Sequence, residues 1–308
     1  MSYIWYKYDY NSSDLIPRSI EDILCEISLT IPIGIITSKD FDFIYPKTKK
    51  FAKILSCILG LETFVLNDKE QTNHNKNILN ENKKVSIEDI VSTKDVDSID
   101  MISGFDRGML SIKSHILNEI AVYLEKNFHK INNEKKVLKG EENILGGITF
   151  DWRHNSNWMV NKEKYQEIVK ESVYNILNSD QQKEVRIPKE KSSFYQQHLF
   201  IQEYSTHPFI DVYVTKLNKG GAFDSVVSKL FEISDIKGNI IYLGDSENDN
   251  PAFRKADISI GVNSDNRLNP TLDCTYTIKF ENLSILLKRL VDNDLISQNH
   301  CYISEFSI

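Results

Sequence analysis

The sequence predicts an α/β fold in which a mostly parallel sheet carries helices on both faces. Short apolar segments of strand length recur along the chain, amphipathic helical segments lie between several of them, and polar residues follow the strands directly. The clearest case is the strand expected at 240–243, after which Gly244 breaks the apolar run and Asp245 emerges. Ligands of open α/β sheets bind at the carboxyl ends of the strands, so this turn is a candidate site.

The composition is that of a soluble globular protein and argues against several functional classes. The 308 residues suffice for one large domain or two ordinary ones, with 41% hydrophobic and 26% charged residues. The formal net charge of −7 argues against a nucleic-acid partner, because no broad basic field is present to neutralise a phosphate backbone. No apolar run approaches the ~20 residues of a membrane span, and the first residues lack the regions of a signal peptide.

The four cysteines are scattered and show no Cys-x-x-Cys spacing, which indicates reduced thiols. Reduced thiols predict a cytoplasmic protein. The charge and hydropathy predict that neither a nucleic acid nor a membrane is its partner, and we expect a monomer or a homodimer. A small phosphate ester remains a possible ligand, since one lysine and one metal ion suffice to bind it.

Residues 1–101 are expected to form strands and helices in turn. The helix at 19–29 is well defined, because its apolar residues recur at helical spacing and form one stripe. The other expected elements are a strand at 4–8 that ends at Asp9, a strand at 31–36 that ends at Thr37-Ser38-Lys39, a helix at 51–59 stopped by Gly60, a strand at 63–66, and a mobile polar loop at 67–84.

The middle of the chain, residues 102–213, is expected to form a small α/β unit of its own. Its expected elements are helices at 109–127 and 162–177 and strands at 148–153, 199–201 and 210–214.

The last part of the chain, residues 214–308, returns to the main sheet. Lys219 and two glycines precede a helix whose apolar side includes Val226 and Leu230, and Pro251 opens a helix that runs to Ala256. The remaining expected elements are the strands at 240–243, 258–262 and 276–280 and a helix at 283–291.

The string Gly-Asp-Ser-Glu-Asn-Asp at 244–249 resembles the fourth motif of the haloacid dehalogenase (HAD) superfamily of phosphotransferases, in the class with a large α/β cap. Three other segments resemble the remaining motifs in the same order: 9–13 the first, Thr37 the second, and Lys219-Gly-Gly the third. Each motif alone is also compatible with an ordinary turn or helix start. Four such motifs in the order of the family are hard to produce by chance. The resemblance implies a HAD-type Rossmannoid core made of 1–101 and 214–308, with 102–213 inserted as the cap.

The resemblance also implies a chemistry, in which Asp9 attacks a phosphate monoester and forms an aspartyl-phosphate that water hydrolyses. Mg²⁺ would offset the negative charge on the transferring group. The implied metal ligands are Asp9, the main-chain carbonyl of Asn11, Asp245 and Asp249, and the implied phosphate-binding residues are Ser13, Thr37, Ser38, Lys219 and Asn248.

One position departs from the family pattern. Asn11 stands where the family has the aspartate that acts as general acid and base, and an amide can neither give nor take that proton. We therefore expect reduced or altered activity. The alternative is a protein that kept the fold, lost most turnover, and binds a phosphorylated sugar as a sensor or as a non-catalytic subunit.

The expected substrate is a sugar phosphate. The size of the cap and the residues of the third and fourth motifs resemble those of sugar phosphatases. They favour trehalose 6-phosphate first, and mannosyl- or glucosyl-3-phosphoglycerate second. Arg153 and His154 follow a strand of the middle unit in a run that resembles the cap strand of trehalose-phosphate phosphatases, so both are candidate substrate contacts. An exposed arginine on a polar face is the simpler interpretation of Arg153 alone.

Overall fold

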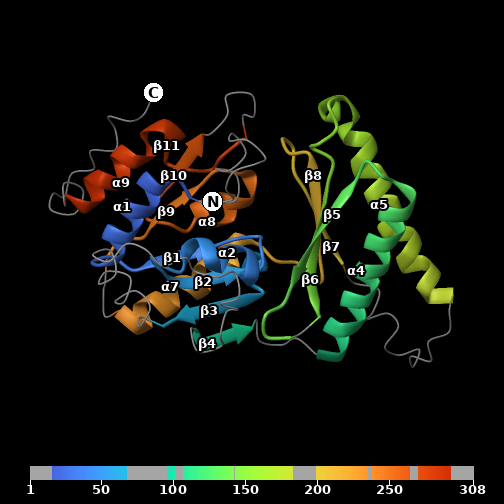
Figure 1. Cartoon of the computed structure of the whole chain (residues 1–308), viewed down its shortest axis with the longest axis horizontal. Coiled ribbons are helices and arrows are strands. Elements are labelled where there is room, and N and C mark those ends of the chain that lie inside the picture. Colours follow the sequence, from blue (N-terminus) through green and yellow to red (C-terminus); the bar gives the residue numbers. More distant parts are fainter. Residues whose placement is uncertain are drawn as a thin grey trace, which may run out of the picture. The chain divides into compact units, whose positions relative to one another are not determined.

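The computed structural model describes residues 16–67, 96–101, 107–141, 143–182, 199–234, 238–263 and 270–292 (Figure 1). The chain divides into two compact units, of which the first combines Met1–Met101 with Asn218–Ile308 and the second is Ile102–Leu217. The middle segment expected at 102–213 lies inside the second unit. The expected strand at 4–8 and residues 68–84 of the expected loop lie outside the described residues.

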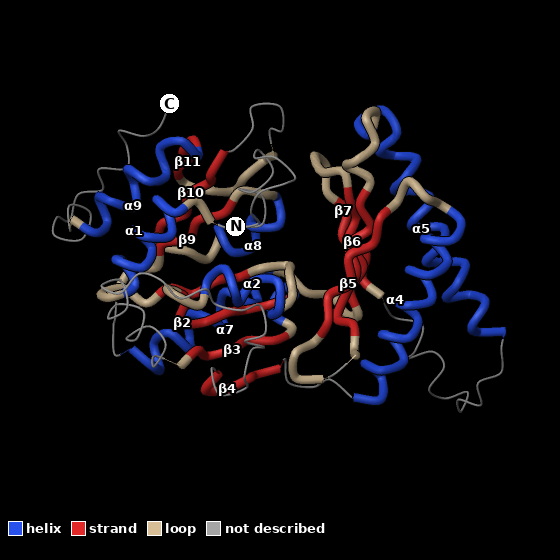
Figure 2. The backbone as a smooth tube through the Cα atoms, viewed as in Figure 1, coloured by secondary structure: helices blue, strands red, loops and turns tan. Residues whose placement is uncertain are grey.

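The described part of the first unit contains two sheets (Figure 2). In the order β1-β2-β3-β4, the first pair is parallel and the other two pairs are antiparallel. In the order β11-β10-β9, all neighbours are parallel. The strands are β1 (Ile33–Ile36), β2 (Ala52–Cys57), β3 (Glu62–Leu66), β4 (Val96–Met101), β9 (Ile241–Gly244), β10 (Ile258–Asn263) and β11 (Tyr276–Lys279).

Helices cover these sheets through apolar faces. α7 (Lys219–Ser234) packs on β1 and β2, where Val226 and Phe223 join a buried cluster with Ile36 and Ile54. α1 (Arg18–Ser28) lies beside α9 (Leu283–Val291), as Figure 1 shows, and buries Ile20, Leu24 and Ile27 as the helical spacing predicts. The shorter helices are α2 (Phe41–Thr48) and α8 (Asn250–Phe253), so the helix expected to reach Ala256 ends earlier.

The predicted helix at 51–59 is wrong. Residues 52–57 form β2, whose neighbours on both sides are strands, and Ile54, Leu55 and Cys57 are completely buried. A strand buried on both faces loses its polar alternation, so its apolar run does not differ in pattern from a buried helix. The prediction also missed α2, which the Asp40 side chain caps by accepting a hydrogen bond from the Phe43 amide at 3.1 Å.

The second unit is a sheet with both of its long helices on one face (Figure 1). All neighbours in the order β5-β6-β8-β7 are antiparallel. Ile148, Phe150 and Trp152 alternate along β6 and are buried, whereas Thr149 and Asp151 point to the other face. The elements are α4 (Arg107–Asn127), α5 (Trp158–Gln182), β5 (Asn132–Val137), β6 (Leu145–Asp151), β7 (Phe200–Glu203) and β8 (Phe209–Tyr213).

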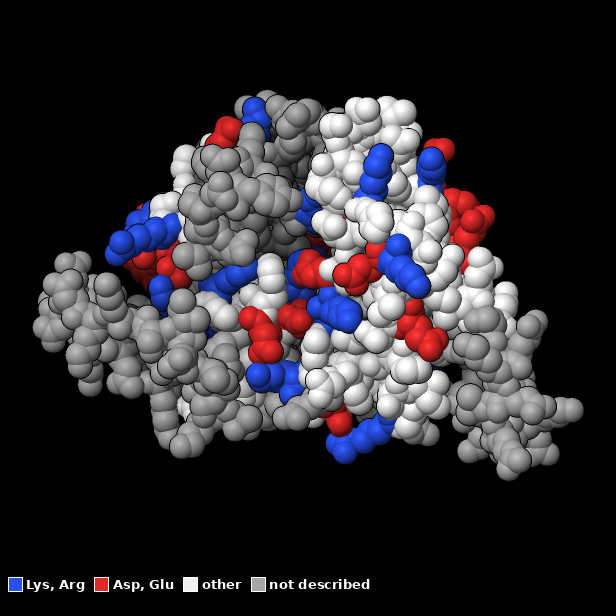
Figure 3. Space-filling view, turned by 45° about the vertical axis from the view of Figure 1, so that its right-hand side comes forward, with Lys and Arg blue, Asp and Glu red and all other residues white. Residues whose placement is uncertain are grey.

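The described surface carries charges of both signs. On the face drawn in Figure 3, lysines and arginines are interspersed with aspartates and glutamates, and neither sign forms a continuous field there. In the part of the chain that the structure describes, no helix is long and apolar enough to cross a membrane.

Candidate active site

The structure places six of the predicted site residues in the first unit, at the ends of strands or the start of a helix. Thr37 directly follows β1, Asp245 directly follows β9, and Lys219 is the first residue of α7. Asn248 and Asp249 belong to the short 3-10 helix η3 (Glu247–Asp249), and Ser38 follows Thr37. Asp9, Asn11 and Ser13 lie outside the described residues.

Lys219 and Asp249 form a buried ion pair. The Lys219 Nζ lies 2.7 Å from the Asp249 Oδ1, and the two side chains are 1% and 0% exposed. Two charges removed from water in this way must be compensated by each other and by further hydrogen bonds, or the pair would be strongly unfavourable. Tyr242 provides one of these bonds, since its hydroxyl donates to the same Asp249 Oδ1 at 2.7 Å.

The other oxygen of Asp249 is held by the turn after β9. The Asp249 Oδ2 accepts hydrogen bonds from the Ser246 Oγ at 2.9 Å, the Ser246 amide at 3.1 Å and the Asp245 amide at 3.2 Å. Burial alone would raise the pKa of Asp249, but the Lys219 ammonium and the hydrogen bond from the Tyr242 hydroxyl hold that pKa well below its ordinary value. Asp249 is therefore an ionised carboxylate with both oxygens engaged.

Gly244 makes this arrangement possible. A Cβ atom at this position would lie 2.4 Å from the Asp249 Cγ and 2.6 Å from its Cβ, closer than such atoms approach in proteins. The glycine that ends β9 thus leaves room for the carboxylate that the following turn brings back over the strand.

Asp245 is the second buried carboxylate of the turn. It is 7% exposed, and burial together with the neighbouring Asp249 charge raises its pKa. Its oxygens are the hard donors that Mg²⁺ prefers, so its chemistry fits the predicted metal. Within the described ranges no three His, Cys, Asp or Glu side chains converge on one point, and the predicted ligand set requires Asp9 and Asn11, which lie outside them.

The Thr37 loop is built by a left-handed turn. Ile58, Leu59 and Gly60 have φ values of 49°, 58° and 95°, and within this turn the Leu59 amide donates to the Thr37 carbonyl at 2.8 Å. The Ile58 amide likewise donates to the Lys39 carbonyl at 2.9 Å. Both ends of the loop are thereby fixed, and Thr37 itself is 2% exposed. The Lys39 amide donates to the Thr37 Oγ1 at 3.1 Å. Because the Oγ1 accepts this bond, the Thr37 hydroxyl proton points away from the Lys39 amide and can be donated in another direction.

The same turn connects the Thr37 loop to the helix that begins with Lys219. A Cβ atom on Gly60 would lie 2.8 Å from the Cβ of Ala222, in the first turn of α7. This close approach, together with the positive φ, requires glycine. The predicted phosphate-binding residues Thr37 and Lys219 are therefore placed by one packed segment of the first unit.

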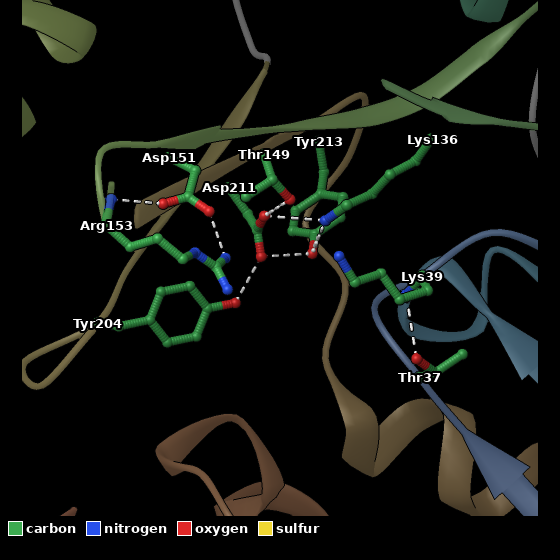
Figure 4. A network of polar contacts seen from close by, with 9 residues as sticks. All are labelled: Thr37, Lys39, Lys136, Thr149, Asp151, Arg153, Tyr204, Asp211 and Tyr213. Carbon is green, nitrogen blue, oxygen red and sulfur yellow. Dashed lines mark hydrogen bonds and ion pairs between the residues drawn. The ribbon is translucent and has the colours of Figure 1, made fainter. Parts of the chain in front are cut away.

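Arg153 and His154 lie in the second unit, just beyond β6. Figure 4 shows the contacts of Arg153. Arg153 forms an ion pair with Asp151, whose Oδ1 also accepts from the Arg153 amide at 2.8 Å, and its guanidinium lies 5.7 Å from the ring centre of Phe209. His154 is exposed, and its Nδ1 lies 3.3 Å from the Asn132 Nδ2. The two contacts between Arg153 and Asp151 fix the direction of the arginine side chain.

A second buried ion pair, which the sequence did not predict, lies in the sheet of the second unit, on the face opposite α4 and α5 (Figures 1 and 4). The Lys136 Nζ lies 2.8 Å from the Asp211 Oδ1, and the side chains are 1% and 2% exposed. Thr149 donates to the same oxygen at 2.5 Å, and the hydroxyls of Tyr204 and Tyr213 donate to the Oδ2 at 2.7 and 2.9 Å.

The charge of Asp211 depends on these neighbours. Burial alone would raise the pKa of Asp211, but the Lys136 ammonium and the hydroxyl donors lower that pKa below its ordinary value. The one signal in the sequence was an aspartate inside an apolar strand, at 209–213, where a charge must find a partner.

Comparison with known proteins gives the family. The sequence model of the haloacid dehalogenase-like hydrolases matches residues 108–279, more than half of the chain. The chain therefore belongs to the haloacid dehalogenase-like hydrolase family. No curated protein matches it in sequence.

Two solved structures share the fold at low sequence identity. A trehalose-6-phosphate phosphatase related protein is 12% identical, with 92% of this chain and 91% of that chain covered and a TM-score of 0.54. The C-terminal domain of the C. albicans trehalose-6-phosphate phosphatase is 13% identical, with 94% and 89% covered and a TM-score of 0.57. The predicted fold class, a HAD-type α/β core with an α/β cap, is confirmed.

Proposed function

We propose that this chain is a Mg²⁺-dependent phosphatase that hydrolyses a sugar phosphate, with Asp9 as the nucleophile. The observation that carries the proposal is the buried Lys219–Asp249 pair beside Asp245 at the end of β9. The Lys219 side chain is held by a carboxylate with both oxygens engaged, and its remaining N–H groups suit phosphoryl oxygens.

The proposed reaction has two steps. A carboxylate oxygen of Asp9 bonds to phosphorus while the bond from phosphorus to the sugar oxygen breaks, and the departing sugar oxygen takes up a proton. Water then attacks the phosphorus of the aspartyl-phosphate, the bond from phosphorus to the Asp9 oxygen breaks, and inorganic phosphate leaves while Asp9 is regenerated as a carboxylate. In both steps Lys219 and the Thr37 hydroxyl bind phosphoryl oxygens, with Ser13, Ser38 and Asn248 as further contacts.

Mg²⁺ would be held by Asp9, the Asn11 carbonyl, Asp245 and Asp249, and would supply positive charge beside the transferring group. Of this set, Asp245 is the described ligand that the structure supports best, because its buried carboxylate lies beside Asp249 and a cation would offset the repulsion between them. Asp249 remains a predicted ligand, although its oxygens already accept five hydrogen bonds.

We further propose that the second unit is the cap and that Arg153 and His154 contact the sugar. The two trehalose-6-phosphate phosphatase relatives of the fold support trehalose 6-phosphate as the first substrate to assay, with mannosyl- or glucosyl-3-phosphoglycerate second. The expected result of Arg153→Ala is a raised KM on the sugar phosphate, with little change on a small aryl phosphate that lacks the sugar.

Asn11 supports a second candidate function, a sensor or non-catalytic subunit that binds a phosphorylated sugar. An amide at the acid/base position removes a contribution of ~10²–10⁴ to the rate. Phosphate release from a panel of sugar phosphates, with and without Mg²⁺ and beside an Asn11→Asp variant, decides between the two functions. An enzyme shows residual turnover that rises on the order of 10²-fold in the variant. A variant that stays silent while the parent protein binds a sugar phosphate tightly would establish the sensor.

A further inference from the structure

Among the described residues, Tyr242 is the one donor to Asp249, besides Lys219 itself, that comes from outside the turn at 245–249. It lies on β9, three residues before Asp245, and its hydroxyl donates to the Asp249 Oδ1 at 2.7 Å. The Lys219 Nζ donates to the same atom, also at 2.7 Å. The phenol and the ammonium therefore share one carboxylate oxygen.

The ring of Tyr242 is held by two other aromatic rings. Phe223 lies edge to face at a centroid distance of 5.8 Å, and Phe253 does so at 5.4 Å. Phe223 lies about one turn beyond Lys219 in α7, and Phe253 ends α8, which directly follows Asp249. Such ring contacts favour defined geometries. The elements that carry the ion pair thus also orient the phenol.

The shared oxygen restricts where the ammonium can sit. The phenol hydroxyl occupies one side of the Asp249 Oδ1 at hydrogen-bonding distance, so the ammonium cannot approach this oxygen from that side. Lys219 donates to the Oδ1 from another side through one of its three N–H groups, and the other two point away from that oxygen. Without the phenol the ammonium could move across the carboxylate, and the carboxylate would keep only the Ser246 and Asp245 donors on its other oxygen.

We propose that Tyr242 is a positioning residue for Lys219: it directs the free N–H groups of the ammonium toward the phosphoryl group without touching the substrate. The inference rests on the proposed phosphatase function. A displaced ammonium still attracts the anionic substrate, because Coulomb attraction depends weakly on direction. It loses the directed contact that strengthens as charge develops in the transition state.

The test is Tyr242→Phe, assayed for Mg²⁺-dependent hydrolysis of an aryl phosphate. We expect kcat to fall about tenfold and KM to change little, since the loss of a whole oriented donor costs ~10²–10³ and here the donor is displaced and not removed. Tyr204→Phe is the matched control, because Tyr204 also donates to a lysine-paired, buried aspartate at 2.7 Å. It should lower the melting temperature similarly and leave kcat unchanged.

An unchanged kcat in Tyr242→Phe overturns the inference, and so does an equal fall in Tyr204→Phe. If the parent protein hydrolyses no ester, the proposed function fails, and calorimetric binding of orthovanadate in the presence of Mg²⁺, which mimics the phosphoryl group in the transition state, then tests the positioning separately. Weaker vanadate binding in Tyr242→Phe than in the parent and in Tyr204→Phe supports it. Equal binding in all three proteins, or none in the parent, overturns it.

Discussion

In the part of the chain that the structure describes, each unit buries a lysine–aspartate pair, and the two pairs differ in where they lie along the helices and strands. Lys219 and Asp249 are 2.7 Å apart at the start of α7 and in the turn after β9. Lys136 and Asp211 are 2.8 Å apart and lie within two strands, β5 and β8. In both pairs a tyrosine hydroxyl donates to the aspartate at 2.7 Å. The chemistry is therefore nearly the same, and the positions are not.

The difference lies in which groups satisfy the aspartate. Asp249 takes three of its five hydrogen bonds from the turn that carries it, so its place depends on local backbone. The Asp211 carboxylate accepts hydrogen bonds from side chains, which belong to β5, β6 and β8 and to Tyr204 just after β7. We infer that the first pair holds a charge at the edge of a sheet, where ligands bind, and that the second links the strands of its sheet.

The largest expected effect separates the two lysines by activity. Lys219→Met should lower kcat by ~10²–10³, because a preorganised donor to the phosphoryl group is lost. Lys136→Met should leave kcat unchanged. Both variants should lose ~3–5 kcal/mol of stability, since each leaves an aspartate buried without its counter-ion. Phosphate-release kinetics and urea unfolding measure the two effects; a fall in kcat in Lys136→Met of the size seen in Lys219→Met would contradict the distinction.

If Lys136→Met does not fold, the double variant Lys136→Met with Asp211→Leu provides the same comparison. Replacing both partners of a buried pair by apolar residues is often neutral for stability, because no uncompensated charge remains.

An intermediate effect comes from one added methyl group beside each pair. In Gly244→Ala the new Cβ would lie 2.4 Å from the Asp249 Cγ, and in Gly147→Ala it would lie 2.6 Å from the Tyr213 Cδ1. Both variants should lose ~1–3 kcal/mol through overpacking. Only Gly244→Ala should also lower kcat, because it displaces the carboxylate that holds Lys219. Thermal melting and kinetics on the same preparations test this, and equal kcat values in the two variants would refute it.

The smallest effect concerns acid stability, through the carboxyl of the second pair. The pKa of Asp211 is lowered in the folded protein from its ordinary value of 3.8, since the Lys136 charge and the hydroxyl donors outweigh burial. The unfolded chain therefore binds the proton of Asp211 more readily than the folded protein does. The ion pair consequently stabilises the fold fully above pH 3.8, and this stabilisation is lost as the pH falls through the lower pKa of the folded protein. Urea unfolding at a series of acidic pH values should show a shallower loss of stability in the Lys136→Met, Asp211→Leu variant than in the parent. Parallel curves would show that the pair does not contribute.

Much of the candidate site could be predicted from local sequence, because its chemistry lies where strands end. The apolar run at 240–243 and the break at Gly244 predicted a strand that delivers Asp245, and β9 ends at that glycine. The helix at 19–29 was predicted from apolar spacing and is present as α1. In each of these cases the pattern was local and had a single period.

What the sequence could not show depends on contacts between distant residues. β5 reads Asn-Asn-Glu-Lys-Lys-Val and carries no apolar pattern, and it is a strand because β6 pairs with it along its length. The largely apolar segment 51–59 has no periodicity that distinguishes a strand from a helix. Residues 52–57 are a strand because they pair with β1 and β3.

The partners of the buried charges are the clearest case. Lys136 meets Asp211 across 75 residues, and Lys219 meets Asp249 across 30. The sequence, through its resemblance to the family motifs, marked Lys219, Asp245 and Asp249 as candidate site residues. It could not show that Asp249 uses one oxygen on Lys219 and Tyr242 together, because a buried charge is satisfied by whichever donors the packed fold brings within hydrogen-bonding distance.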